Sequence, residues 1–311
     1  MYAFGADIGG TTTKIGIFDD TGDLLDKWEI PTRTQNHGND ILSDLSKSVW
    51  DTIKEQKIPA NQIVGLGVGV PGAVTADGTV LHTANLGWDT FHVPSVLENL
   101  VQLPVKVAND ANVAAFGEMW QGGGKGIRNQ VMVTLGTGVG GGIIVNGSIV
   151  TGAMGAGGEI GHIHVQDGET LVCGCGNTGC LEQYASATGI ARLAKRFLQE
   201  TNEESSLKDK NPDAKAVFDA AKEGDPLANR VVLAFSEYLG KGLAIVAAVV
   251  NPEVFVISGG VSKAGEFLLQ YIRPAYERYA FPACRGTELK LAQLGSDAGI
   301  FGAAGLLLLN K

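Results

Sequence analysis

The sequence predicts an α/β protein made of two similar halves. A strand, a glycine-rich turn and a second strand lie within residues 2–22, around the run D-I-G-G-T-T-T-K. The same unit recurs 127 positions later as V-T-L-G-T-G-V-G-G-G-I-I-V, which aligns Gly9 with Gly136 and Ile17 with Ile144. Any two glycine-rich hairpins look alike, but here the strand, the first turn and the second turn all agree, which favours an internal duplication.

Helix and strand patterns alternate along the rest of the chain. Leu42, Leu45, Val49 and Ile53 recur at helical spacing, so a helix is expected from about Asn39 to Gln56. Further helices are expected to begin near 110 and to span about 186–199, 214–222, 225–249 and 262–279, with strands within 63–72, 104–110 and 253–261. The apolar C-terminal run, D-A-G-I-F-G-A-A-G-L-L-L-L-N, is expected to form a helix that docks on the first domain.

The length of the chain predicts two domains. With 311 residues it exceeds what one hydrophobic core usually requires. The first domain is expected to comprise 1–118 and 296–311, and the second 119–295 with the cysteine-rich segment 162–180.

Charge and hydropathy exclude several classes of partner. The net charge of −9 disfavours nucleic acid and anionic membranes. The apolar run 231–250 is interrupted by Glu237 and Lys241, so we expect a buried helix rather than a membrane span. The N-terminal residues show no basic region and no cleavage site, so a reducing, cytoplasmic location is expected.

A cysteine-rich segment predicts a metal site. It contains E-I-G-H, ten further residues, and then C-G-C-G-N-T-G-C-L-E. Its candidate ligands, His162, Cys173, Cys175 and Cys180, form a Cys₃His set that suits tetrahedral structural zinc. Disulfides are the alternative, but Cys173 and Cys175 are too close to pair easily and a reducing compartment disfavours them. Cys284 lies far from this segment and is interpreted as a buried or incidental thiol.

Three glycine-containing turns are candidate phosphate or nucleotide sites. Backbone N–H groups can approach phosphate oxygens closely at glycine, threonine adds hydroxyl donors and lysine adds charge, while Asp7 could hold Mg²⁺. The first turn offers Asp7, Gly9, Gly10, Thr11, Thr12 and Lys14, the second Gly136, Thr137 and Gly138, and the third, S-G-G-V, Gly259 and Gly260. A plain hairpin turn is the alternative for the first of these.

Two matches to G-x-G-x-x-G do not indicate a dinucleotide site. They begin at Gly67 and at Gly136. A Rossmann fingerprint must open a helix, whereas both of these runs lead into strand patterns. A nicotinamide or flavin role is therefore rejected.

Asp110, in V-A-N-D-A-N, is the candidate general base. It lies where a strand pattern meets a helix pattern, a position typical of ligand-binding edges. A helix N-terminus favours the carboxylate form and weakens the base, but phosphoryl transfer has a loose transition state and needs proton removal late. The alternative is that Asn109 or Asp110 only caps the helix.

These motifs together resemble the ROK family of sugar kinases, within the actin-like ATPase and hexokinase superfamily. The matching runs are D-I-G-G-T-T-T-K, G-V-P-G, A-N-D-A-N, L-G-T-G-V-G-G-G, E-I-G-H and C-G-C-G-N-T-G-C-L-E. The resemblance covers essentially the whole chain. It implies two duplicated actin-like (ribonuclease H-like) domains around a cleft, which close over the sugar.

The resemblance also implies residue roles. Asp110 is the catalytic base, and one ring nitrogen of His162 binds zinc while the other faces the sugar. The sugar-binding residues it implies are Gly72, Asn85, Asn109, Asp110, Glu159, His162 and Glu182.

The expected function is that of a glucokinase, which transfers phosphate from ATP to the 6-hydroxyl of D-glucose with Mg²⁺ and a structural Zn²⁺. The alternatives are a kinase for mannose, N-acetylmannosamine or N-acetylglucosamine, a polyphosphate donor in place of ATP, and a non-catalytic sugar sensor. No winged helix-turn-helix module precedes the first strand, so a repressor is not expected. The resemblance further suggests a homodimer or homotetramer.

Overall fold

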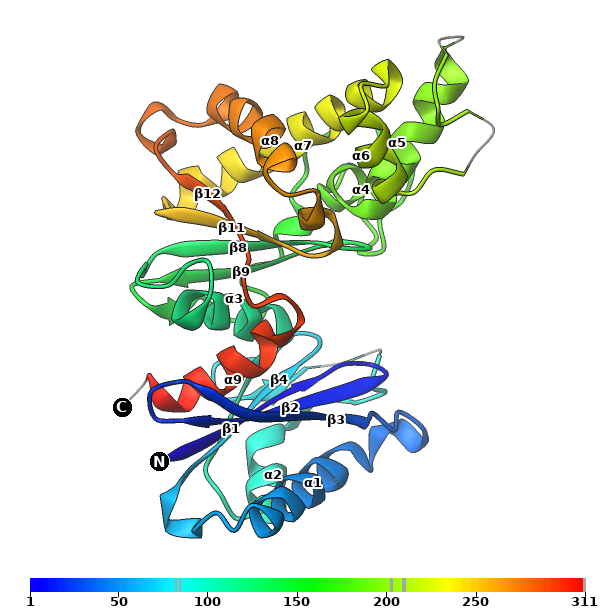
Figure 1. The fold of residues 1–311 in the computed structure, drawn as a ribbon. Coiled ribbons are helices and arrows are strands. Elements are labelled where there is room, and N and C mark those ends of the chain that lie inside the picture. The colour runs from blue at the N-terminus through cyan, green and yellow to red at the C-terminus, as the bar shows by residue number, and fades with distance from the viewer. Residues whose placement is uncertain (82, 84, 202–203, 209–210, 310–311) are drawn as a thin grey trace. The chain divides into compact units, whose positions relative to one another are not determined.

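The fold is mixed α/β, with two five-stranded sheets (Figure 1). The structure, a computed structural model, describes the chain except residues 82, 84, 202–203, 209–210 and 310–311. The strand orders are β3-β2-β1-β4-β7 in one sheet and β10-β9-β8-β11-β12 in the other. The expected α/β class and the pair of similar sheets are therefore confirmed.

The chain divides into two compact units. The first comprises Met1–Arg128, Gly142–Gly158 and Gln293–Lys311, and the second Asn129–Gly141 and Glu159–Ala292. The domain boundaries expected at 118/119 and 295/296 stay predictions, and the last two residues of the expected first domain lie outside the described part.

The first unit contains the first sheet. Its strands are β1 (Tyr2–Ile8), β2 (Thr12–Asp19), β3 (Leu24–Pro31), β4 (Ile63–Val70) and β7 (Val105–Asn109). Strands β1, β2 and β3 pair antiparallel, whereas β4 pairs parallel with both β1 and β7. Because parallel strands end at the same edge, the carboxyl ends of β1, β4 and β7 lie together.

The side chains of strand β1 pack against helices on both faces of the sheet. Phe4 and Ala6 are buried with α1 (Ile41–Glu55) and α2 (Val93–Val101), whereas Ala3 packs with α9 (Ala298–Leu308) on the opposite face. The alternation follows from the two-residue period of a strand. Figure 1 shows α1 and α2 below this sheet and α9 above it.

Glycines on the α9 face bring backbones into contact. A Cβ at Gly67 of β4 would lie 1.8 Å from the carbonyl oxygen of Ala303, and one at Gly5 of β1 would lie 2.0 Å from that of Ile300. In the same way, a Cβ at Gly302 would lie 1.6 Å from the carbonyl oxygen of Val113 in α3 (Asp110–Gln121). Glycine alternates with apolar residues in I-V-G-L-G-V-G-V. One face of β4 therefore packs closely against α9, and the other face carries the large side chains of the core.

In the second unit, helices pack on a parallel part of the second sheet. Strand β11 (Val254–Ser258) pairs parallel with β8 (Gln130–Leu135) and β12 (Glu288–Leu291). Residue Phe255 packs edge-on against Tyr276 of α8 (Glu266–Tyr279), with ring centroids 5.6 Å apart. The chain passes from the second unit into the first within β9 (Val139–Val145), and β10 (Ser148–Ile149) follows.

The long apolar helix α7 (Pro226–Val250) packs as a core helix. It passes a length and composition test for a membrane span, but 61% of its most apolar window is buried inside the structure. Gly240 allows it to approach α8 closely, because a Cβ there would lie 2.6 Å from the carbonyl carbon of Ala275. This agrees with the buried helix expected from the sequence.

Several elements differ from the expectation. The helix expected over 262–279 is divided, because Gly265 has a φ of +74° between a 3₁₀ turn at Gly260–Ala264 and α8. The short helix α2 and the edge strands β3 and β12 were not expected. Helix α2 is only nine residues long and begins with a proline at its second position, so its periodicity is weak.

We predict that Gly67→Ala lowers the free energy of unfolding by about 3 kcal/mol or more. Overpacking usually costs about 1–3 kcal/mol, and here the added methyl meets backbone atoms of Ala303 that cannot change rotamer. Urea unfolding followed by circular dichroism measures the change. Gly286→Ala is the matched control, because a Cβ there meets nothing within 4 Å. Equal stability of the two variants would contradict the close packing of α9.

Candidate active site and metal cluster

The predicted residues of the first unit gather where parallel strands end. In the strand register Asp7 lies opposite Gly69, and Val70 lies opposite Asn109. The Gly72 carbonyl accepts a hydrogen bond of 3.0 Å from the side-chain amide of Asn109. Asp7, Gly72, Asn109 and Asp110 therefore share one edge of the sheet.

Asp7 is a partly buried carboxylate without a close cationic partner. Burial, reinforced by the negative charge of Asp110, raises the pKa of Asp7 from 3.8 to about 6. Lys14 opposes this shift, but its Nζ atom is directed at the carbonyl oxygen of Ser296, 3.1 Å away, and lies 3.9 Å from Glu29. Desolvation thus outweighs the favourable charge.

The first glycine turn links β1 to β2. The Gly9 N–H donates to the carbonyl oxygen of Thr12 at 3.0 Å, and the carbonyl oxygen of Thr11 accepts from the N–H of Thr32 at 2.8 Å. A Cβ at Gly10 would lie 3.8 Å from the Cβ of Asn85, so the predicted sugar residue Asn85 lies beside this turn.

Asn109, not Asp110, caps helix α3. The Asn109 side-chain oxygen accepts from the N–H of Asn112 at 3.0 Å. Asp110 is the first helical residue, and its Oδ1 atom accepts from the amide of Asn109 at 2.8 Å and from the N–H of Ala111 at 2.8 Å. The capping role is therefore assigned to Asn109, and the Asp110 carboxylate is oriented by two donors.

The second glycine turn lies against a predicted sugar residue. Gly136 donates its N–H to the carbonyl oxygen of Gly138 at 3.0 Å, with Thr137 exposed between them. A Cβ at Gly138 would lie 2.5 Å from the Oε2 atom of Glu182. Only glycine at this position leaves room for that carboxylate.

The third glycine turn borders a cavity of about 330 Å³ in the second unit. Gly259 has a φ of +87°, and a Cβ there would lie 2.4 Å from the carbonyl oxygen of Leu135 at the end of β8. Gly260 lines the cavity, as does Ala187, whose N–H donates to the carbonyl oxygen of Gly136 at 2.8 Å. The second and third turns are thus connected through the cavity wall.

The cavity has an apolar floor and a charged rim that sequence reasoning missed. The apolar side chains include Phe218 and Val261, and the charged ones are Lys215, Lys222, Lys263, Asp213 and Asp219, of which Lys215 is paired with Asp219. These residues come from α6 (Ala214–Lys222) with its N-cap Asp213 and from the turn 260–264, which are distant in sequence; the turn begins in the S-G-G-V motif, whereas α6 carries no motif.

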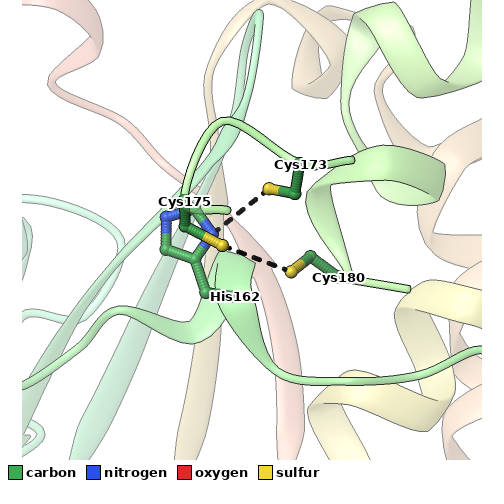
Figure 2. Close-up of side chains that lie close together, drawn as sticks. All are labelled: His162, Cys173, Cys175 and Cys180. Carbon is green, nitrogen blue, oxygen red and sulfur yellow. Dashed lines mark hydrogen bonds between the residues drawn. The ribbon is translucent and has the colours of Figure 1, made fainter. Parts of the chain in front are cut away.

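The four predicted metal ligands converge, as Figure 2 shows. Their ligand atoms all lie within 4.8 Å of one another. The Sγ atoms of Cys175 and Cys180 are 3.6 Å apart, and the Nδ1 atom of His162 lies 3.7 Å from the Sγ atom of Cys173. The three cysteines are free thiols, because a disulfide would place two sulfur atoms about 2.05 Å apart. Such separations match the edges of a tetrahedron around one ion with metal–sulfur bonds of about 2.3 Å.

Local backbone geometry builds this cluster. His162 ends a 3₁₀ turn at Ile160–His162, while Gly176 and Gly179 adopt φ values of +90° and +73° that turn the chain back between the cysteines. Burial raises the pKa of Cys173 to about 12, so a metal must displace the proton of that thiol.

Two glutamates flank the imidazole of His162. The Oε2 atom of Glu159 lies 3.9 Å from its Nε2 atom, and the Oε1 atom of Glu182 lies 3.7 Å from its Nδ1 atom. Glu182 also accepts from the thiol of Cys173 at 2.9 Å. The structure thus brings Glu159, His162 and Glu182 together in the second unit.

The protein has two similar sheets, each with a glycine-rich turn after one of its strands, and a cysteine–histidine cluster. Together these features define a two-domain kinase of actin-like fold. The chain belongs to the ROK family, whose sequence model matches residues 3–309. The membership expected from the sequence motifs is thereby confirmed.

Relatives of known name and structure cover nearly the whole chain. It is 44% identical to a glucokinase of Halalkalibacterium halodurans, over 97% of this chain and 94% of that one. A solved ROK family glucokinase from Streptomyces griseus, in complex with glucose and AMPPNP, is 34% identical with a TM-score of 0.75 and full coverage of both chains. The ROK hexokinase from Thermus thermophilus is 32% identical with a TM-score of 0.82, covering 99% of this chain and 98% of that one.

We predict that Asp7 lowers the stability of the ligand-free protein as the pH rises from about 4 to 6. Below this window the carboxyl is protonated in both states, and within it the unfolded chain loses its proton first, so the free energy of unfolding falls. A shift of about two units corresponds to about 3 kcal/mol. Asp7→Asn has no proton to lose, so its stability relative to the original protein should increase through this window.

Urea unfolding of metal-free protein at several pH values between 4 and 7 measures this difference. The exposed Asp89→Asn is the control for removal of a carboxylate. Parallel pH profiles for Asp7→Asn and the unchanged protein would contradict the raised pKa.

Proposed function

We propose that the protein is an ATP-dependent glucokinase that phosphorylates the 6-hydroxyl of D-glucose. The observation that carries the proposal is the conjunction of an oriented Asp110 carboxylate, glycine turns at two sheet edges and a Cys₃His cluster flanked by glutamates. Similarity to named glucokinases over nearly the whole chain supports the same conclusion.

Asp110 is proposed as the base that orients and deprotonates the attacking hydroxyl. Two donors hold its Oδ1 atom, which fixes the plane of the carboxylate. Because the transition state of phosphoryl transfer is loose, positioning of the hydroxyl matters more than basicity.

Hydroxyl recognition is assigned to the polar groups that the family resemblance implies. Asn109, Glu159 and Glu182 offer amide and carboxylate groups, and His162 directs Nε2 away from the cysteines. Gly72 and Asn85 are proposed as further sugar contacts, because Gly72 is bonded to Asn109 and Asn85 lies beside the first glycine turn.

The nucleotide is proposed to lie in the cavity beside Gly260. A cavity of about 330 Å³ with Phe218 and Val261 suits the ring of a nucleobase, and Lys222 and Lys263 of its lining suit phosphates, while Lys215 is paired with Asp219. Such a cavity favours ATP over polyphosphate as the donor. Phosphate contacts are assigned to the turns containing Gly9, Gly10, Thr11, Thr12 and Lys14, and Gly136, Thr137 and Gly138, together with Gly259.

Mg²⁺ is proposed to be held by Asp7, directly or through water. Asp7 lies at the edge with Asp110, and the two charges together favour a divalent cation. When bound, the cation would neutralise charge on the phosphates.

Structural Zn²⁺ is proposed for the cysteine cluster. Three sulfurs and one imidazole nitrogen form a donor set that zinc prefers, and their separations fit tetrahedral coordination. The ion would fix the loop that ends at Glu182. A cytoplasmic location, expected from the N-terminal sequence, and assembly as a homodimer or homotetramer, suggested by the family resemblance, stay predictions.

We predict strong preference for glucose when ADP release is measured against glucose, mannose, fructose, N-acetylglucosamine and N-acetylmannosamine. Asp110→Asn should lower turnover by roughly 10²–10⁴-fold, because general base catalysis contributes about that factor. Glucose binding to this variant, measured by calorimetry, should remain.

The outcomes separate the parts of the proposal. Preference for an acetylated sugar would overturn glucose as the substrate but leave the kinase assignment. Sugar binding without ADP production by the unchanged protein would identify a sensor. Full turnover by Asp110→Asn would remove the base assignment.

We predict about one zinc ion per chain, measured by elemental analysis of protein purified without added metal. Cys175→Ser should lose most of this zinc, because one thiolate ligand is replaced by a poor one. Cys284→Ser is the matched control, since this buried thiol lies outside the cluster and contacts the carbonyl oxygen of Ala247. Equal zinc contents in the two variants would contradict the site.

A further inference from the structure

A second set of side chains, outside the cysteine cluster, fastens the metal-binding loop. We call Glu169, Tyr184 and Arg192 the outer clamp. Glu169 lies in the loop before Cys173, Tyr184 lies in the one-turn helix α4 (Glu182–Ala185), and Arg192 lies in α5 (Ala187–Glu200). All belong to the second unit.

Glu169 is the centre of the outer clamp. Its Oε1 atom accepts from the N–H groups of Thr170 and Leu171, each at 3.0 Å. Its Oε2 atom accepts from the hydroxyl of Tyr184 and from the guanidinium of Arg192 at 3.0 Å. These donors, the Tyr184 hydroxyl above all, lower the pKa of Glu169 to about 2, so the carboxylate is ionised at neutral pH.

Arg192 uses both arms of its guanidinium. One nitrogen binds Glu169, and the other donates to the carbonyl oxygen of Gln183 at 2.8 Å. The guanidinium carbon lies 4.8 Å from the centre of the Tyr184 ring. A planar fork that also stacks is geometry that lysine cannot reproduce.

Tyr184 connects the outer clamp to the core. It is 1% exposed and stacks on Tyr238 of α7, with ring centroids 4.1 Å apart. The hydroxyl of Tyr238 in turn donates to Gln166 at 3.2 Å, at the start of the same loop. The loop is thus attached to α5 and α7 at both of its ends.

The outer clamp acts on residues next to the site. Gln183 follows Glu182 directly, accepts from the N–H of Cys180 at 3.0 Å and donates to the carbonyl oxygen of Leu171 at 2.8 Å. Because Arg192 holds the carbonyl of Gln183, it holds the helical turn that presents Glu182.

We propose that Arg192 and Glu169 are positioning residues that set the orientation of Glu182 and the closure of the cysteine cluster. The inference rests on the proposed function where it concerns sugar, but not where it concerns the loop. Neither side chain contacts the cluster directly, so both act through α4 and the residues before Cys173. The cysteine cluster and the outer clamp thus hold the same loop through different residues.

The test compares Arg192→Met with Arg196→Met, its matched control one turn further along α5. Among the described residues Arg196 pairs with Glu200 of the same helix, at 3.6 Å, and lies over the ring of Phe197, so its loss leaves the loop attached. Arg192→Met should raise the KM for glucose roughly 10–100-fold, the usual effect of losing a side chain that holds a binding residue in place. The kcat and the KM for ATP should change little. Arg192→Lys should fall between the two.

A second readout does not depend on catalysis. Zinc release from each variant to a chromogenic chelator should be roughly tenfold faster or more for Arg192→Met than for Arg196→Met. Glu169→Gln, which removes the charge, should behave like Arg192→Met, and the double variant should add little because both act on one contact.

The results distinguish failure of this inference from failure of the proposed function. If both arginine variants show the same glucose KM and the same zinc release, the positioning role is overturned, even where Arg192→Met melts at a lower temperature. If the unchanged protein phosphorylates no sugar, the proposed function fails, and the zinc-release comparison still decides the role of the outer clamp.

Discussion

The close approach of α9 to β1, β4 and α3 is the contact on which the first unit's site depends. Helix α9 comes from the far end of the chain, and the glycines of β1 and β4 let its backbone touch the sheet. As a consequence, Gly299 in its first turn lies against Asp7, since a Cβ there would be 2.3 Å from the Oδ2 atom. The partial positive charge of a helix N-terminus favours a carboxylate at this place. It does not reverse the effect of burial, because the pKa of Asp7 is still raised.

A second buried carboxylate fixes the chain where it enters α9. Glu118 of α3 is fully buried and accepts from the N–H groups of Gly123, Gln293 and Leu294, at 2.7 to 3.1 Å. Backbone donors satisfy the hydrogen-bonding capacity of this side chain, as a buried polar group requires. One side chain therefore holds the end of α3 and the start of α9. Asp110 lies at the other end of the same helix α3.

The sequence contained local features of the site in full and long-range ones hardly at all. The ligands of the metal cluster lie within 19 residues, so spacing and glycine content were enough to predict their convergence. The strand pattern that leads into a helix pattern predicted that Asp110 would lie at a ligand-binding edge, but only the strand register places Asp7 at the same edge. By contrast, Glu169 and Arg192 lie 23 residues apart on elements of different type, and no periodicity connects them.

The elements that sequence reasoning missed have physical reasons of the same kind. The cavity wall combines Phe218 with Val261, which meet only after α6 and the turn following β11 are packed. The break before α8 depends on Gly265, an isolated glycine whose positive φ is set by its surroundings. The sequence pattern around Gly138 is that of a phosphate-binding turn. It does not show that Gly138 also lies against the carboxylate of Glu182.

A carboxylate in each unit differs in how strongly its surroundings favour the ionised form. In the second unit, Glu169 is satisfied by donors and remains ionised without any ligand, so the loop has its charges balanced in advance. In the first unit, Asp7 lacks such donors, and the nearby Asp110 disfavours its ionised form. A divalent cation would reverse that preference, because it replaces repulsion between two carboxylates with attraction to both. This like-charge pair lies at the edge where Mg²⁺ is proposed to bind, and a bound cation there would remove the repulsion.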